Sequence, residues 1–194
     1  VRRQLALRRI WSDKHDKVAL FREAVGDLGR WLELAPKTEK ALDERGTALR
    51  EMGDTLSKLG KRAEAKRAWE ASSKDLNAWL GLNPGDYEAF HQVATNLGRQ
   101  GRREEAVEVL TRAKKLLRGR LDPLADLLEV RGGFYVELGR AEEAITDLSF
   151  IVDTRKGIRS PPAPDIRLQR SRAYRLLGRW KNARDDVVAG LNSS

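Results

Sequence analysis

The stretch Leu138-Gly139-Arg140-Ala141-Glu142-Glu143-Ala144 joins the end of one helical pattern to the acidic start of the next. Glycine ends helices because it adopts a left-handed backbone at little cost, and carboxylates are favoured in the first turn of a helix. Similar turns recur at Gly60, Gly101 and Gly178, so the turn glycines are separated by 41, 38 and 39 residues. Each is followed five residues later by an alanine, namely Ala65, Ala106, Ala144 or Ala183. This period predicts an array of similar units.

Apolar residues at helical spacing place one helix on each side of every turn glycine. The expected helices cover residues 38–59 and 62–82, 87–99 and 103–117, 124–138 and 141–153, and 165–177 and 180–191. Thr38 and Asp122 are the expected N-caps, and Arg155 to Pro164 form an irregular loop. We therefore predict a single repeat domain of residues 1–194, with units at 38–82, 86–118, 122–155 and 165–191. Residues 1–36, with helices at 2–11 and 18–35, form a divergent first pair or cap.

The composition excludes several classes of site. The 194 residues include no cysteine, which excludes disulfides, thiolate metal sites and cysteine nucleophiles. His15 and His91 are the only histidines and fall in different units, so we expect no metal site. No stretch has the apolar length of a membrane span. We expect a soluble protein and favour the cytoplasm, and the start at Val1 is compatible with a domain of a larger protein.

Basic residues exceed acidic ones, with 38 against 29, for a net charge of +9. Arginine dominates, with 26 arginines and 12 lysines. The excess is spread over several segments, which is typical of solvated helix faces. Binding to nucleic acid or to another anionic surface is the alternative function that this charge suggests.

Large and small residues recur at fixed distances from the turn glycines. Large residues stand eleven and four positions before the glycine and nine positions after it, and a small residue stands seven before it. These offsets put the large residues on one helix face, and the small residue lets two helices approach closely. The large residues are Leu49, Phe90 and Leu128; Leu56, Leu97, Tyr135 and Tyr174; and Trp69, Leu110, Leu148 and Val187; the small ones are Gly53, Ala94, Gly132 and Ser171.

This pattern resembles the tetratricopeptide repeat (TPR), most closely at Phe90, Ala94, Leu97, Gly101 and Ala106. The resemblance covers residues 46–191. It departs from the family in its spacing of 38–41 residues, against 34, and at Arg167, where the last unit should carry a large apolar residue. The resemblance implies an all-α fold, a right-handed superhelical solenoid of four to five antiparallel helix hairpins. It also implies a concave groove, lined by the first helix of each pair, that binds a peptide segment or a partner protein.

First-helix residues ten, six and two positions before each glycine are expected to line this groove. They are Arg50, Asp54 and Lys58; His91, Thr95 and Arg99; Glu129, Gly133 and Glu137; and Leu168, Arg172 and Leu176. One subgroup of the family clamps the C-terminal carboxylate of chaperones with lysines, asparagines and an arginine. Asp54 and Thr95 stand where asparagines would be needed, so we do not expect that ligand.

No motif in the sequence indicates catalysis or a cofactor. The pairs Glu142-Glu143 and Glu104-Glu105 open helices, where the helix dipole favours negative charge, and this explains them without acid–base chemistry. The sequence has no phosphate-binding glycine loop, nucleophile elbow or zinc-binding helix. We therefore predict a non-enzymatic interaction scaffold.

The tryptophans and the proline-rich stretch have structural interpretations. The five tryptophans are Trp11, Trp31, Trp69, Trp79 and Trp180. Trp31, Trp69 and Trp79 are expected on core or helix-packing faces rather than on a base-stacking surface. Pro161 to Pro164 are interpreted as an inter-repeat loop, with a polyproline docking element as the alternative.

Residues equidistant from a hairpin turn should face each other. Eight positions before the glycines stand Met52, Val93, Arg131 and Arg170, and eight positions after them stand Ala68, Val109, Asp147 and Asp186. Two facing pairs are thus apolar, and the other two join arginine to aspartate. The pattern predicts ion pairs inside the last two hairpins that hold their shape and take no part in function.

Overall fold

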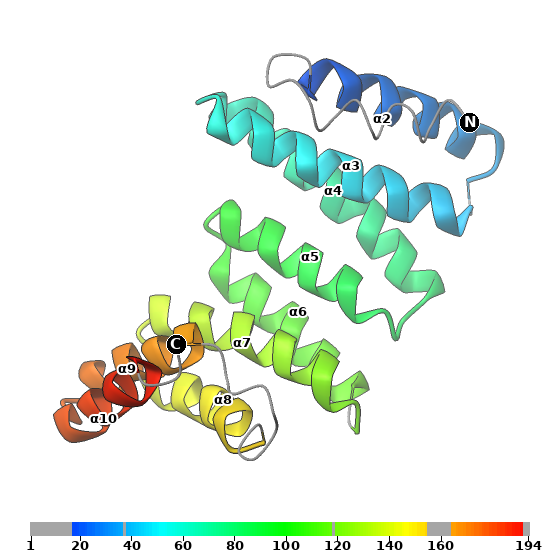
Figure 1. Ribbon diagram of the computed structural model, residues 1–194. Coiled ribbons are helices and arrows are strands. Elements are labelled where there is room, and N and C mark those ends of the chain that lie inside the picture. Colours follow the sequence, from blue (N-terminus) through cyan, green and yellow to red (C-terminus); the bar gives the residue numbers. More distant parts are fainter. Residues whose placement is uncertain (1–16, 37, 118, 155–163, 192–194) are drawn as a thin grey trace. The chain divides into compact units, whose positions relative to one another are not determined.

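The computed structural model describes residues 17–36, 38–117, 119–154 and 164–191, which contain nine helices and no strand. The chain divides into two compact units, residues 1–101 and 102–194 (Figure 1). The helices of the first unit are α2 (Lys17–Leu34), α3 (Glu39–Lys58), α4 (Arg62–Leu82) and α5 (Tyr87–Arg99). Those of the second are α6 (Arg103–Leu116), α7 (Leu121–Glu137), α8 (Ala141–Thr154), α9 (Pro164–Leu176) and α10 (Trp180–Leu191). The fold is an all-α array of helix hairpins.

The turn glycines end the first helices of the hairpins. Gly60, Gly101, Gly139 and Gly178 have φ values of 77°, 79°, 73° and 69°. After Gly60, the amide of Lys61 donates to the carbonyl of Leu56, and the Gly60 amide donates to that of Ser57; the equivalent bonds recur at Gly139 and Gly178. This Schellman motif satisfies carbonyls that the helix end leaves unpaired, and its left-handed position would cost another residue about 1–2 kcal/mol.

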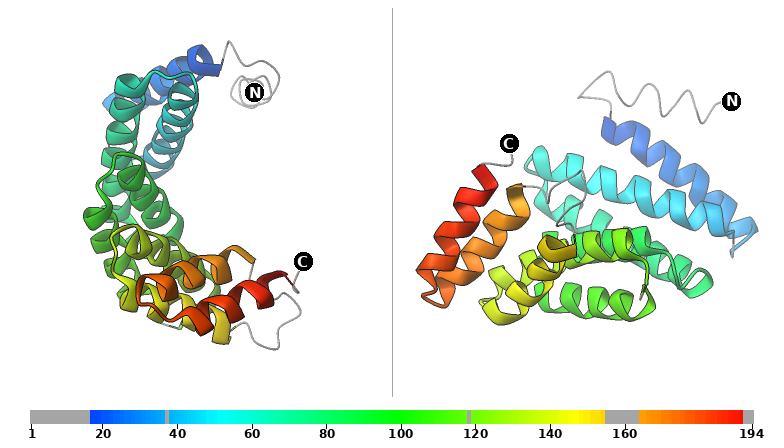
Figure 2. Two further views of the ribbon diagram at one scale, coloured as in Figure 1. Left: turned by 90° about the vertical axis from the view of Figure 1, so that its left-hand side faces the viewer. Right: turned by 60° about the horizontal axis from the view of Figure 1, so that its bottom comes forward.

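Each hairpin core combines a small residue on the first helix with a large residue on the second. A Cβ at Gly53 of α3 would lie 2.5 Å from Nε1 of Trp69 on α4, and a Cβ at Gly132 of α7 would lie 2.8 Å from the side chain of Leu148 on α8. The two glycines therefore allow the close approach that the offsets predict. Figure 2 shows the paired helices of both units lying side by side.

Apolar clusters fill the space between and beside these hairpins. In the first unit, one cluster contains Val18, Leu56, Ala65, Ala68 and Trp69, with Met52 packed against it. In the second, α7, α8 and α9 contribute Leu124, Ala125, Leu128, Leu148, Ile151, Val152 and Ile166. Met52 thus packs against the cluster that contains Ala68, its predicted facing partner.

Both predicted ion pairs are present. Arg131 donates to the two carboxylate oxygens of Asp147 at 2.7 Å and 2.7 Å, and Arg170 donates to those of Asp186 at 2.8 Å and 2.6 Å. The side chains of the first pair are only 7% and 3% exposed. The structural role of these pairs, and the facing of Val93 and Val109, remain predictions.

A third ion pair of the same kind joins α3 to α4. Arg45 donates to Asp75 at 2.7 Å through both Nε and Nη2. Arg45 stands fifteen positions before Gly60, and Asp75 stands fifteen positions after it. They too are equidistant from the turn, one heptad further from it than the facing pairs at eight positions.

One predicted N-cap is wrong, and the other is confirmed in position. Helix α7 begins at Leu121, with Arg120 as its N-cap, so Asp122 is a first-turn residue and not the cap. Pro123 is tolerated as the third helical residue because amides of the first turn have no partner within the helix. Thr38 occupies the predicted N-cap of α3, but its hydroxyl donates to the carbonyl of Ala35 at 2.8 Å and makes no cap bond.

The prediction that Trp31 lies on a packing face is wrong. Trp31 is 41% exposed, because α2 buries a different face, which carries Val18, Phe21 and Leu32 and packs against α3 and α4. Trp69 is buried, and the half-buried Trp79 donates from Nε1 to Asp86 at 2.7 Å.

Arg167, the departure from the family pattern, finds a carboxylate partner. Its Nη1 lies 3.7 Å from Oδ1 of Asp186, which already pairs with Arg170. This contact explains how a charged residue is accommodated where an apolar one was expected.

Several expectations fall outside the described residues. They are the helix at 2–11 with Trp11, His15, and the loop from Arg155 with Pro161 and Pro162. Pro164 lies within the described part and is the first residue of α9, one position before the expected start.

Candidate partner-binding site

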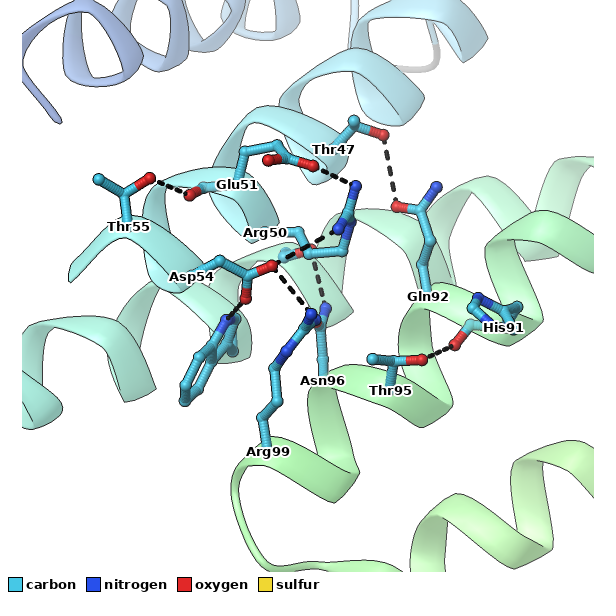
Figure 3. A network of polar contacts seen from close by, with 12 residues as sticks. Thr47, Arg50, Glu51, Asp54, Thr55, His91, Gln92, Thr95, Asn96 and Arg99 are labelled. Atoms are coloured by element: carbon cyan, nitrogen blue, oxygen red, sulfur yellow. Dashed lines mark hydrogen bonds and ion pairs between the residues drawn. The ribbon is translucent and has the colours of Figure 1, made fainter. Parts of the chain in front are cut away.

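The first helices of neighbouring pairs, α3 and α5, lie side by side in the first unit and bring three predicted groove residues together. Arg50 and Asp54 come from α3, and Arg99 comes from the last turn of α5 (Figure 3). Asp54 Oδ2 lies 2.9 Å from Nη2 of Arg99 and 3.6 Å from Nη1 of Arg50. One carboxylate therefore joins two guanidinium groups from two consecutive repeats.

The second oxygen of Asp54 fixes its orientation. Trp69 of α4 donates from Nε1 to Oδ1 of Asp54 at 3.0 Å, and the guanidinium carbon of Arg99 lies 5.9 Å from the centre of the Trp69 ring. A cation near an aromatic face gains about 0.5–1 kcal/mol at an exposed site. Trp69 thus serves both the hairpin core and the orientation of the polar cluster on its surface.

Burial and the charges of Asp54 and Arg50 shift the pKa of the Arg99 guanidinium. Burial lowers its pKa, Asp54 opposes that decrease, and Arg50 adds to it. Arg50 also donates to Glu51 at 2.5 Å, while its Nε is buried without a hydrogen-bond partner among the described residues. The exposed donors of Arg50 are thus shared between Glu51 and Asp54, both on its own helix.

The remaining predicted residues of this unit surround the cluster. His91 and Thr95 lie half-buried on α5, and the Thr95 hydroxyl donates to the His91 carbonyl at 2.8 Å. Lys58 is exposed in the last turn of α3. Among the described residues, no group of three or more His, Cys, Asp or Glu side chains could hold a metal ion.

The opposite end of this face is acidic. Burial raises the pKa of Asp43 on α3, and the carboxylates of Asp86 and Glu88, at the start of α5, add to the increase. The surface of α3 and α5 is therefore acidic toward the start of α5 and rich in guanidinium groups toward its end.

In the second unit, the predicted residues of α7 and α9 do not form one cluster. A Cβ at Gly133 would lie 3.4 Å from Oε1 of Gln169 on α9, so Gly133 marks the close approach of these first helices. Glu137 pairs with Arg103 of α6, whereas Arg172 is exposed on α9. Glu129 is half-buried, and Leu168 and Leu176 are exposed.

Some residues of the α3 and α5 surface were missed from the sequence. Thr47 donates to Gln92 at 3.4 Å, and Glu51 pairs with Arg50. Thr47 stands thirteen positions before its turn glycine, and Glu51 and Gln92 stand nine before theirs. Steps of three, four and seven residues keep these positions on the same face as those six and two before the glycine, so the helical period could have identified them.

A buried chain of hydrogen bonds behind this surface has no comparable signal in the sequence. Asn96 of α5 donates from Nδ2 to the hydroxyl of Ser72 at 3.0 Å, and Ser72 donates to the carbonyl of Gly46 at 2.6 Å. The two side chains link the second helix of one pair to the first helix of the next. No shared offset marks them in the other repeats.

Comparison with solved structures shows the TPR fold. The crystal structure of MamA matches 90% of this chain and 89% of its own, with 17% sequence identity and a TM-score of 0.67. YrrB, described as a TPR protein with an unusual peptide-binding site, matches 92% of this chain and 80% of its own, with 17% identity and a TM-score of 0.63. Kinesin light chain TPR-like repeats of Podosopora anserina match 98% and 91%, with 20% identity and a TM-score of 0.66.

Comparison at the level of sequence gives no further assignment, since no protein-family model and no curated protein matches the chain. The three structures named above share 17–20% sequence identity with the chain, so the likeness shows the fold alone.

Proposed function

We propose that the protein is a non-enzymatic interaction scaffold that binds a peptide segment of a partner protein on the surface of α3 and α5. The observation that carries the proposal is the convergence of Arg50, Asp54 and Arg99 from two consecutive repeats. The peptide-binding site of YrrB, which has a similar fold, supports a peptide as the ligand.

The charges around Asp54 favour an acidic peptide. Arg50 and Arg99 pair with the carboxylates of Glu51 and Asp54, and the exposed Lys58 adds a third cation to the predicted groove residues of this unit. Glu51 is half exposed and pairs with Arg50 next to it in sequence, so a carboxylate of the ligand could replace it at small cost. Two arginines that share a carboxylate can each form charge-assisted bonds to a second one.

The experiment is binding of fluorescent peptides of opposite charge. We expect acidic peptides to bind more tightly than basic ones, and the charge reversal Arg50→Glu to weaken acidic peptides by about tenfold or more. Lys66→Glu is the matched control because Lys66 is an exposed lysine on the second helix α4. Equal effects of the two reversals, with both variants still folded, would contradict this binding surface.

The second unit contributes to binding if the partner also contacts α7 and α9. Charge reversals at Glu129 and Arg172 are then expected to weaken the same ligand. If Arg50, Glu129 and Arg172 can all be reversed without loss of binding, the groove assignment from the sequence is wrong.

Nucleic-acid binding remains the alternative function. The distribution of charge over the described helices does not favour it. Residues 1–16, 37, 118 and 155–163 hold ten basic and two acidic residues, so the described residues hold 28 basic against 27 acidic ones. The helices are thus almost neutral overall. An electrophoretic shift assay at low and moderate salt tests this alternative, because phosphate contacts weaken steeply with salt.

None of the described helices combines the length and the apolar character needed to cross a bilayer.

A further inference from the structure

The second helix of a repeat presents one face to the next pair, and α8 shows what that face requires. Along α8, positions two, nine and thirteen after the turn glycine are Ala141, Leu148 and Val152, all buried. Leu148 and Val152 share a cluster with Ile166 of α9, and Ala141 shares another with Ala173 of α9. Position ten, Ser149, accepts a hydrogen bond from Arg170 of α9 at 3.0 Å. This face of α8 is therefore covered by the next first helix.

The same positions of α10 are apolar but uncovered. They are Trp180, Val187, Val188 and Leu191, with exposed fractions of 66%, 38%, 50% and 73%. Ala183, Asp186 and Gly190 form a different face of α10, which is buried. The helix thus has one face packed in its own hairpin and a second apolar face that is exposed, here called the α10 stripe.

We propose that the α10 stripe binds an amphipathic helix of a partner protein that carries a carboxylate in the middle of its apolar face. Helix-in-groove recognition of this kind uses apolar residues at helical spacing on the bound segment.

The charges of α10 specify the carboxylate. Arg184 stands six positions after Gly178, in the centre of the stripe, where α8 has the apolar Ile145. Its side chain is 74% exposed, and its partner is the adjacent Asp185 at 3.5 Å. Lys181 lies three residues before Arg184 on the same side of the helix, so two cations accompany one carboxylate. An acidic helix neutralises this excess, whereas a basic helix would be repelled.

A second feature distinguishes the bound helix from the repeats of this chain. On α8, the hydroxyl of Ser149 accepts from Arg170, and on α6, Thr111 accepts from Arg131 at 2.9 Å. The equivalent residue of α10 is Val188, which cannot accept a hydrogen bond. The bound helix should therefore have an apolar residue where α7 and α9 have an arginine.

The chain itself offers poorer occupants. The exposed face of α2 carries the charges of Arg22, Glu23, Asp27 and Arg30, so a second copy would place charged groups against the stripe. Residues 1–16 contain five basic and two acidic residues, the wrong sign for a stripe with excess cations. A partner helix with a carboxylate satisfies both the apolar surface and its charge.

The test uses two synthetic helical peptides with leucines at i, i+3 and i+7 on one face. One carries a glutamate in the centre of that face, and its twin carries a lysine there. Fluorescence anisotropy should show the glutamate peptide binding about tenfold more tightly, and Arg184→Glu should reverse the order. The double variant Val188→Ser/Leu191→Ser should weaken both peptides about tenfold, without a change in melting temperature because both side chains are exposed.

Several outcomes would overturn the proposal. They are failure of the glutamate peptide to bind, equal binding of the twins, and binding that Arg184→Glu does not alter. Self-association of the unliganded chain that the serine variants abolish would assign the stripe to a second copy instead. Loss of peptide binding in Arg50→Glu, but not in the stripe variants, would place the peptide on α3 and α5 and leave only the function proposed above.

Discussion

Removal of the Asp147 carboxylate tests whether the buried arginine of the fourth hairpin needs its partner. In Asp147→Ala, Arg131 loses two hydrogen bonds of 2.7 Å in a site where its own side chain is 7% exposed. Its remaining contacts are the Thr111 hydroxyl at 2.9 Å and the ring of Tyr135, whose centre is 5.5 Å away. Neither carries a full negative charge. A buried charge left without its partner costs about 3–5 kcal/mol, so we expect the melting temperature to fall by on the order of 10 °C.

The double variant Arg131→Met/Asp147→Ala separates the ion pair from the packing. It reproduces the Met52 and Ala68 pair of the second hairpin and leaves no buried charge. Thr111 keeps its bond to the Val107 carbonyl at 2.7 Å, and Lys114, which is 3.3 Å from Asp147, is 42% exposed and can turn to solvent. Replacing both members of a buried pair by apolar residues is often neutral, so the double variant should regain most of the lost stability.

Differential scanning calorimetry of the wild type and both variants measures the effect. Asp185→Ala is the control, because that carboxylate is 56% exposed and its ion pair with Arg184 should contribute less than about 1 kcal/mol. A double variant that melts no higher than Asp147→Ala would refute the facing-pair reasoning and require a different hairpin register.

Four further substitutions test the packing and the charges of the fold by thermal unfolding. Gly132→Ala should destabilise the protein by about 1–3 kcal/mol, because the new Cβ would lie 2.8 Å from the side chain of Leu148. The control Gly26→Ala, in open space within α2, should stabilise it by about 0.5–1 kcal/mol. Equal effects of the two substitutions would contradict the close approach of the helices at Gly132. Asp43→Asn should raise the melting temperature at pH 7, since the raised pKa of Asp43 shows that the fold disfavours its ionised form. This gain in melting temperature should shrink as the pH falls through the raised pKa toward 3.8. A gain independent of pH would refute the prediction. Arg167→Leu should be neutral or stabilising, because Asp186 keeps its bonds to Arg170 and the buried, unpaired Nε of Arg167 is removed; a loss above about 2 kcal/mol would contradict this.

The hairpins could be predicted from the sequence because their determinants are local. A glycine at positive φ, a small residue seven positions before it and a large residue nine after it are all within a few helical turns of one another. The equidistance rule also predicts the contact between facing charges, since it depends only on the turn. It would have found Arg45 and Asp75 if it had been extended by one heptad.

Contacts between consecutive pairs could not be predicted in the same way. The ion pair of Asp54 and Arg99 depends on how one repeat is rotated relative to the next, and no single turn fixes that rotation. The helix-opening glutamates show the same difference. Their positions follow from the helix dipole, but Glu142 also accepts from Arg179 of the following pair at 2.7 Å. This second role appears only when the repeats are placed beside each other.

Arginines inside the hairpins and arginines on the surface differ in what they can offer a ligand. Every nitrogen of Arg131 is committed within the second unit, with Nε and Nη2 on Asp147 and Nη1 on Thr111. Such an arginine cannot serve a ligand without breaking its hairpin. Arg50 instead pairs with Glu51 and Asp54 of its own helix, and Arg184 pairs with Asp185 of its own helix. Substitutions at these positions can therefore change the partner of the protein while the buried pairs maintain its fold, which is why binding and melting temperature should respond to different sets of variants.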